Sequence, residues 1–259
     1  MKTTTPRLFP ALLAGMSLVS VCEAATISQN FEAGEDTSAW GAAWTGGGTT
    51  AAFLNTTAGG LVAGDGSSST QGFSRSFKNN TVGLDLAAAY SITMDVQVNA
   101  FDGPSGGQFE IVDGAFGSGN AANLRIFTED LGGGNFAYHW QARDNSTGWQ
   151  DLGINLDLAS PYNIELLIDP ESFTYSATVK AINAAGTVLD SASLSGLAFD
   201  PNVITNGQNG NLLFYVQASV GGTEAMVDNI NIQTVPEPSS LALASLLLPW
   251  LAGRRRRSN

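Results

Sequence analysis

The chain has 259 residues and a formal net charge of −12, a length that suits one large domain or one domain with processed ends. Six of the 11 basic residues but only two of the 23 acidic residues lie in residues 1–24 and 235–259. Residues 25–234 therefore carry 5 basic and 21 acidic side chains, a net charge of −16. Such a charge argues against binding to DNA, RNA or an anionic membrane. It is compatible with binding calcium or neutral sugars, and equally with solubility outside the cell.

The N-terminus has the three parts of a secretory signal peptide, which we expect to be helical. Lys2 and Arg7 supply the positive charge, and an apolar run follows over residues 8–21. Small residues in "CEA" predict cleavage after Ala24, and the apolar run is too short for a comfortable membrane span. Because Cys22 is the one cysteine, the mature body has no disulfide and relies on its core or on a metal.

The C-terminus reads "VPEPSSLALASLLLPWLAGRRRRSN". Its apolar run, residues 239–253, is shorter than the roughly 20 residues of a stable span and predicts a short hydrophobic helix, held only transiently in the inner membrane. Arg254, Arg255, Arg256 and Arg257 act as a cytoplasmic stop by the positive-inside rule. Pro236 and Pro238 hold Glu237 in an extended peptide that a processing enzyme can grip.

These three parts, with Val235 to Pro238 as the motif, resemble the PEP-CTERM sorting signal over residues 235–259. The resemblance implies a Gram-negative bacterium, export through the inner membrane and cleavage by an exosortase-type enzyme. It also implies association with exopolysaccharide at the cell surface or in the extracellular matrix. Because such tails follow many unrelated bodies, the resemblance transfers no activity. The expected organisation is a signal peptide at 1–24, a body at 25–234 and a sorting segment at 235–259.

The body shows short runs of alternating apolar and polar residues, separated by clusters of Gly, Asn, Asp and Ser. "SITMDVQVNAF" and "NFAYHWQAR" show the alternation clearly. This pattern predicts an all-β, two-sheet antiparallel jelly-roll sandwich. The stretch from "NFAYHWQARDNSTGWQDLG" to "FTYSATVKA" resembles laminin-G-like and concanavalin-like lectin sandwiches. That resemblance, with "ISQNFEAG" and "VDNINIQ" as terminal strands, implies that the first and last strands lie side by side.

Carboxylates near the two ends of the body suggest a structural calcium site. Glu32 and Asp36 follow the first expected strand, and Asp228 lies in the last. If these strands pair, the side chains can converge on a cation that takes six to eight oxygen ligands. The alternative is a set of scattered surface acids. Zinc has little support, since the body has one histidine and no cysteine.

A catalytic set does not stand out, and no catalytic residue is assigned. Glu110 and Asp113 are three positions apart on one expected strand, so they point to opposite faces. Glu110, His139 and Arg143 can share a polar face, which keeps a polysaccharide hydrolase or lyase open as an alternative.

The polar faces of the expected strands carry amides, charges and aromatic side chains, a mixture typical of sugar-binding sheets and also of ordinary solvated faces. The candidate ligand-binding residues are Gln97, Arg125, His139, Gln141, Arg143, Trp149 and Tyr215. Phe136, Tyr138 and Trp140 are expected in the core, as are Phe173 and Tyr175. Trp40 and Trp44 either cap the sandwich or stack on a ligand.

Taken together, the sequence predicts an exported surface or matrix protein whose lectin-like sandwich binds polysaccharide without chemistry. The alternatives are a polysaccharide hydrolase or lyase, and a purely structural matrix protein.

Overall fold

The computed structural model describes residues 24–31, 38–47, 54–55, 60–63, 70–101, 108–115, 119–217 and 223–235. The expected signal peptide and sorting segment, apart from Ala24 and Val235, lie outside these ranges, as do Glu32 and Asp36. Among the helices in these ranges, none is long and apolar enough to cross a membrane.

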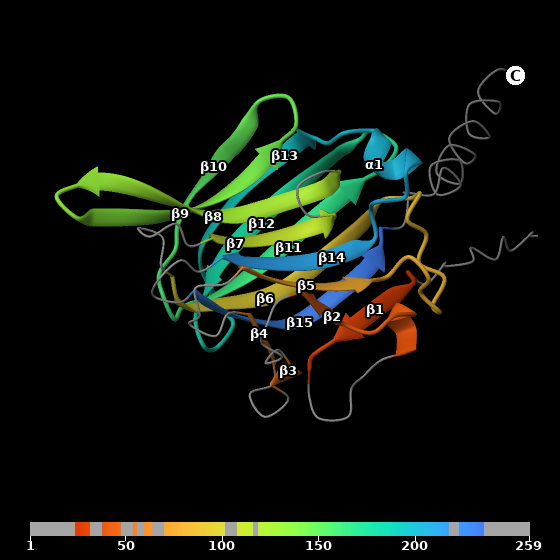
Figure 1. The fold of residues 1–259 in the computed structure, drawn as a ribbon, viewed down its shortest axis with the longest axis horizontal. Coiled ribbons are helices and arrows are strands. Elements are labelled where there is room, and N and C mark those ends of the chain that lie inside the picture. The colour runs from red at the N-terminus through yellow and green to blue at the C-terminus, as the bar shows by residue number, and fades with distance from the viewer. Residues whose placement is uncertain are drawn as a thin grey trace, which may run out of the picture.

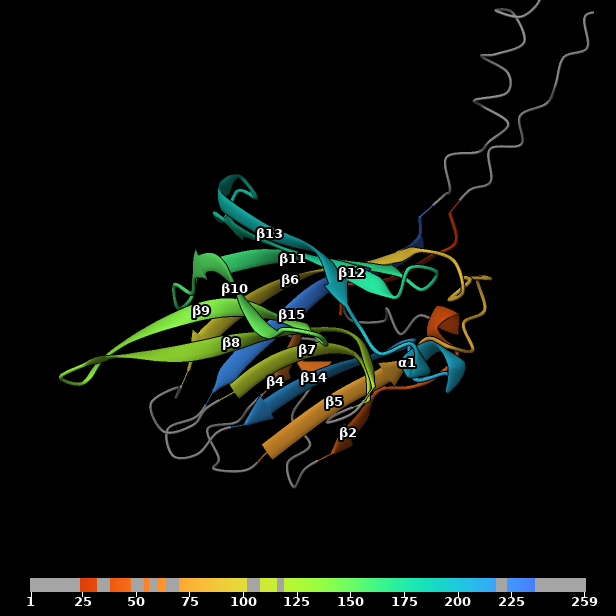
Figure 2. The same cartoon turned by 90° about the horizontal axis from the view of Figure 1, so that it is seen from above.

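Two antiparallel sheets pack face to face, as Figures 1 and 2 show, which confirms the predicted all-β sandwich. In the described residues one sheet has eight strands, in the order β13–β12–β11–β6–β15–β4–β3 with β1 also paired to β15. The other has seven, in the order β10–β9–β8–β7–β14–β5–β2.

The eight-stranded sheet contains β1 (Thr26–Gln29), β3 (Leu54–Asn55), β4 (Gly60–Ala63), β6 (Tyr90–Ala100), β11 (Pro161–Asp169), β12 (Thr174–Ile182), β13 (Val188–Ala198) and β15 (Glu224–Thr234). The seven-stranded sheet contains β2 (Thr45–Gly47), β5 (Thr70–Ser76), β7 (Gln108–Gly114), β8 (Asn120–Gly132), β9 (Asn135–Asp144), β10 (Gly148–Asn155) and β14 (Asn211–Gln217). Two short helices complete the described elements, η1 (Ser38–Trp40) and α1 (Asn202–Thr205).

The period-two alternation in the sequence places the core between the sheets. Along β6, Ile92, Met94, Val96 and Val98 are buried, while the residues between them face outward. The neighbouring strand β11 repeats the pattern, and Ile164 lies opposite Met94 in the antiparallel register. The seven-stranded sheet contributes large buried side chains from its inner face.

The first and last strands of the body lie side by side, as predicted. Ile27 on β1 is the register partner of Ile232 on β15, and Gln29 is the partner of Ile230. The first half of β15 pairs instead with β4, so β1 and β4 occupy the same edge of β15 one after the other.

Trp40 and Trp44 belong to the core region rather than to an open surface. Trp40 is fully buried in η1, and Trp44 packs against it with ring centroids 5.7 Å apart. Trp44 also contacts the ring of Phe214 at a centroid distance of 6.0 Å. The two indoles therefore cap the sandwich, which decides between the two sequence-based alternatives.

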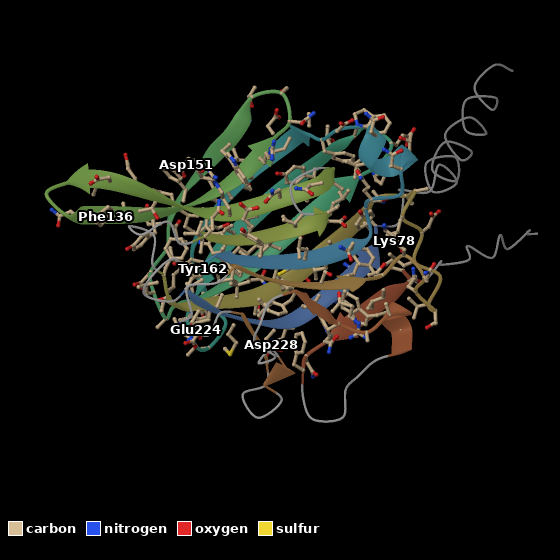
Figure 3. The ribbon with its side chains drawn as sticks, viewed as in Figure 1. Lys78, Phe136, Asp151, Tyr162, Glu224 and Asp228 are labelled. Carbon is tan, nitrogen blue, oxygen red and sulfur yellow. The ribbon has the colours of Figure 1, made fainter. Side chains whose placement is uncertain are left out.

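Two aromatic residues expected in the core lie elsewhere. Phe173 sits in the turn before β12 with a φ of 54°, and it is 36% exposed. Phe136 is half-buried at the start of β9, in the β8–β9 hairpin that projects from the body in Figure 3. Strict alternation fails at Phe173 because the positive φ of the turn reorients its side chain, which packs against Phe199, and it fails at Phe136 because that residue lies in the projecting hairpin.

Candidate functional site

A row of side chains crosses the outer face of the seven-stranded sheet. The antiparallel registers place Tyr215 opposite Glu110, Glu110 opposite Arg125, and Arg125 opposite Gln141. Gln141 in turn lies opposite Asp151 on β10. Since residues in register on neighbouring strands project to the same face, these five side chains form a continuous polar row. We call this row, together with Trp149 and Arg143, the polar face.

Arg125 and Trp149 form the centre of the polar face. The guanidinium carbon of Arg125 lies 3.9 Å from the centroid of the Trp149 ring, and it lies 5.4 Å from the centroid of Phe127. Arg125 Nε and Nη2 both donate to Gln141 Oε1, at 3.2 and 3.0 Å. The arginine is thereby fixed in one orientation, and the half-buried indole is held flat against it.

Glu110 is a buried carboxyl on this face. Desolvation by burial raises the pKa of Glu110, while a hydrogen bond from Asn123 and the charges of Arg125 and Arg143 oppose the rise. Burial also lowers the pKa of Arg125, and the Glu110 charge partly offsets that shift. The charges of Glu110 and Arg125 thus stabilise each other against the cost of burial.

His139 lies at the β10 side of the same face and contacts two carboxylates. Its Nε2 is 3.1 Å from Glu129 Oε2, and its Nδ1 is 3.8 Å from Asp151 Oδ2. A register shift in β10 between Asp151 and Asn155 aims Asp151 toward the histidine, and Gly153 at φ 78° donates its N–H to Asp151 Oδ1. Both carboxylates are about half exposed, so the group is an exposed charge cluster.

Most sequence-predicted binding residues come together on the polar face, with two qualifications. Arg125, His139, Gln141, Arg143 and Trp149 lie on adjacent strands β8, β9 and β10. Tyr215 belongs to the same face but is 8% exposed, so little of it is accessible. Gln97 lies on β6 in the other sheet and donates to Asn99 Oδ1 at 2.7 Å, so the structure does not bring it into this site.

The proposed calcium residues are only partly described. Asp228 lies on β15 opposite Asp95 on β6, and Asp95 accepts hydrogen bonds from Asn163 at 2.9 Å and Asn229 at 2.8 Å. Within the described ranges, no group of three or more His, Cys, Asp or Glu side chains is placed to hold a metal ion. Glu32 and Asp36 lie outside these ranges, so the three-residue site remains a hypothesis. Figure 3 shows Asp228 far from Asp151, so the proposed calcium site is separate from the polar face.

The geometry of the polar face bears on catalysis as well. Glu110 and Asp151 lie on strands three positions apart, which at about 4.8 Å per strand separates their backbones by about 14 Å. Paired glycosidase carboxyl groups lie roughly 5–9.5 Å apart. Glu110 and His139 share the face as expected, yet strand β8 lies between them. Glu110 is therefore poorly placed to work with either residue.

Sequence reasoning missed two buried polar centres. Asp113 on the inner face is fully buried, accepts the Tyr90 hydroxyl, and accepts the N–H groups of Gly210 at 2.8 Å and Asn211 at 3.1 Å. Arg75 is 3% exposed and donates to Gln29 Oε1 at 2.6 Å and to the Ala42 carbonyl at 2.7 Å. The sequence signal that could have identified them is a charged residue at an inward-facing position, Asp113 on β7 and Arg75 on β5.

No family model and no curated protein sequence matches the chain. Among solved structures, botulinum neurotoxin type C, described for its interaction with two ganglioside molecules, is similar at a TM-score of 0.52 and 11% identity, covering 85% of this chain and 50% of that chain. The binding domain of botulinum neurotoxin DC in complex with rat synaptotagmin II is similar at a TM-score of 0.51 and 12% identity, covering 82% and 49%. Peanut lectin with a nine-residue peptide has a TM-score of 0.47 at 11% identity, covering 83% and 100%.

The chain spans about half the length of the neurotoxin structures. At these identities the similarity to the two neurotoxin structures shows a shared sandwich fold and no more. The ligands of those proteins do not by themselves define a ligand for this chain.

Proposed function

We propose that the protein is a non-catalytic polysaccharide-binding protein of the cell surface or extracellular matrix. The observation that carries the proposal is the polar face, where an indole and an arginine are stacked at 3.9 Å amid amide and carboxylate groups on the outer face of the seven-stranded sheet. A sugar presents hydroxyl groups that both donate and accept, together with apolar ring faces. The polar face offers Gln141 and Asp151 for the hydroxyl groups and part of Trp149 for a ring.

The side chains of this face are held in place before any ligand arrives, which lowers the entropic cost of binding. Arg125 is held by Gln141, by Trp149 and by the charge of Glu110, so little side-chain entropy remains to be lost on binding. A hydrolase would need a second ionisable group at a suitable distance from Glu110, and Asp151 and His139 are too far from it across the sheet. If the protein were a hydrolase or lyase, the exposed cluster of His139, Glu129 and Asp151 is the group of residues that would carry the activity.

Binding is tested with purified residues 25–234 in affinity electrophoresis against neutral and acidic polysaccharides. We expect retardation by at least one neutral polysaccharide, and at least tenfold weaker binding by Trp149→Ala. The matched control is Gln97→Ala, which removes a polar side chain from the outer face of the other sheet. Absence of binding to every polysaccharide, or equal losses in the two variants, would overturn the proposal. Release of reducing or unsaturated sugars would instead support the hydrolase or lyase alternative.

We also propose that the tail is a sorting signal of the PEP-CTERM type, as its resemblance implies. Pro236, Glu237 and Pro238 would present the recognition peptide, and the four terminal arginines would hold the C-terminus at the cytoplasmic face. Moving one arginine through the bilayer centre costs about 2.5–3.5 kcal/mol, so a block of four should arrest export.

The two parts of the tail should fail in different compartments in a host with the matching exosortase. Replacing Arg254 to Arg257 by Ser should release uncleaved protein, whereas Glu237→Ala should leave unprocessed protein in the membrane. Mass spectrometry of the surface form is expected to show a C-terminus near Pro238. Detection of Asn259 on the mature surface protein would contradict the sorting proposal.

A structural calcium ion held by Glu32, Asp36 and Asp228 is a further proposal from the sequence. Asp95 lies opposite Asp228, but hydrogen bonds from Asn163 and Asn229 already compensate these carboxylates, so the proposal rests on the sequence pattern alone. Calcium at 1 mM should raise the Tm of the wild type but not of Asp228→Asn, with magnesium as the control ion. Equal responses of the two proteins would rule out this site.

A further inference from the structure

A cavity of about 240 Å³ lies beside the polar face, where β8 and β9 meet the segment that leads from β13 to α1. Asn120 and Asn123 line it from the start of β8, and Arg143 and Asn145 line it from the end of β9. Ala198 and Asp200 close the third side. At about 30 Å³ per water, the volume equals about eight waters, which suits one pyranose ring rather than a longer fragment.

Hydrogen bonds between the two sheets hold the cavity walls in place. The Tyr175 hydroxyl of β12 contacts the backbone oxygens of Asn123 at 2.9 Å and Arg143 at 2.6 Å. The N–H of Asn145 donates to the Ala198 carbonyl at 2.8 Å, and the N–H of Ala198 donates to Asp144 Oδ2 at 3.1 Å. The cavity is thus a preformed part of the fold.

Asn123 is a buried part of the cavity wall. Its side chain is 4% exposed, and its Nδ2 donates to Glu110 Oε2 at 3.4 Å. Its Oδ1 is buried and has no hydrogen-bond partner among the described residues. Because this oxygen is closed to a water-sized molecule, a ligand in the cavity would instead meet the exposed side chains of Arg143 and Asn145 and the half-buried Asp200.

The cavity and the polar face adjoin through Arg143. This residue lines the cavity, and its guanidinium carbon lies 6.0 Å from the centroid of the Trp149 ring. Trp149 is also the register partner of Arg143 across β9 and β10. A sugar chain whose ring rests against Trp149 can therefore place its next unit in the cavity.

We propose that this cavity binds the terminal neutral sugar unit of an unbranched polysaccharide chain, an inference that rests on the proposed polysaccharide binding. The charges of Arg143 and Asp200 offset each other, which favours a neutral unit over a uronic acid. Arg143 donates to one hydroxyl group, Asp200 accepts from a second, and the Asn145 amide bonds to a third. The cavity holds one ring, so the chain ends there while the preceding unit contacts Trp149.

The test varies the chain length of the polysaccharide. At equal total mass, shorter chains have more ends, so a protein that binds chain ends has more binding sites available. Fractions of the polysaccharide that binds in electrophoresis are prepared at several defined lengths and titrated by calorimetry at equal mass. We expect the number of sites per gram to rise in inverse proportion to length. Ala198→Leu, which fills the cavity, is expected to weaken binding at least tenfold, and Arg143→Met at least fivefold.

Ser195→Leu is the matched control, since it adds the same side chain at an exposed position of the same strand. If Ala198→Leu does not fold, Ala198→Val takes its place with a smaller loss expected. Sites that scale with mass, or unchanged binding by the cavity-filling variants, would overturn chain-end recognition and leave polysaccharide binding intact. Absence of binding at every length would instead overturn polysaccharide binding itself, and chain-end recognition with it.

Discussion

The guanidinium carbon of Arg125 lies 3.9 Å from the centroid of the Trp149 ring, although the two residues come from strands that do not pair with each other. Strand β9 lies between β8 and β10, and Arg125 reaches across it while donating to Gln141 on the way. A long side chain thus joins three strands on an exposed surface. The same contact orders the indole that we propose as a sugar platform.

This contact should be measurable as a coupling free energy between the two side chains. We expect a double-mutant cycle with Arg125→Met and Trp149→Leu, measured by urea unfolding, to give about 0.5–2 kcal/mol. The cycle of Arg143→Met with Trp149→Leu is the control, because that cation lies 6.0 Å from the ring and should couple more weakly. Equal coupling in the two cycles would show that the indole is not preferentially ordered by Arg125.

Glu110 should titrate at a still higher pH when Arg125 is removed. Burial raises the pKa of Glu110, and the nearby charges of Arg125 and Arg143 hold that rise in check, Arg125 more strongly than Arg143. Arg125→Met should therefore raise the Glu110 pKa further, and Arg143→Met should raise it less. The side-chain carboxyl ¹³C shift of Glu110, followed by NMR against pH, measures both changes. A lower pKa in Arg125→Met would contradict this account of the polar face.

Asp113 should make the fold less stable as pH rises from about 4 to about 6. Burial raises the pKa of Asp113 from its ordinary value to about 6 in the folded chain. Because the unfolded chain loses this proton at lower pH, the folded state is favoured most below that range and loses the contribution as pH rises. Asp113→Asn keeps an acceptor for the N–H groups of Gly210 and Asn211 and removes the titration.

Urea unfolding of the wild type and Asp113→Asn at pH 4, 5, 6, 7 and 8 tests this prediction. The difference in unfolding free energy between the two proteins should move in favour of the variant as pH rises through that window, and it should be flat above pH 7. A difference that does not depend on pH would mean that Asp113 does not titrate with a raised pKa.

The fold was largely predictable from the sequence because alternation identifies strands and their inward faces. It identified Ile92, Met94 and Val96 as one face of β6, and Trp140 as a core residue of β9. Alternation does not say in which of two sheets a strand lies. Gln97 and His139 both point away from the core, yet they do so on opposite sides of the sandwich.

The site was predictable only in part, for reasons of packing. Gln141 and Arg143 were assigned correctly to one face, but the stacking of Arg125 on Trp149 depends on the pairing of β8, β9 and β10. The cavity beside Asn123 depends on where the β13–α1 segment crosses to the other sheet. Neither contact has a local sequence signal, since each joins segments far apart along the chain.

The last prediction concerns Arg75 on β5, whose hydrogen bonds reach Gln29 on β1 and Ala42 after η1. Its guanidinium carbon lies 4.9 Å from the centroid of the Trp40 ring, while its nitrogens donate to Gln29 Oε1 and the Ala42 carbonyl. Arg75→Met keeps the aliphatic stem but leaves these acceptors without the charged donor, in a place with little water. We expect a loss of about 2–4 kcal/mol in the free energy of unfolding. Hydrogen-exchange protection should fall more at the β1 amides than at amides elsewhere in the sandwich. Lys180→Met is the control, since its partly exposed ion pair with Glu165 at 3.2 Å should contribute at most about 1 kcal/mol. If the two variants lose the same stability, Arg75 is not the residue that holds β1 and η1 in place.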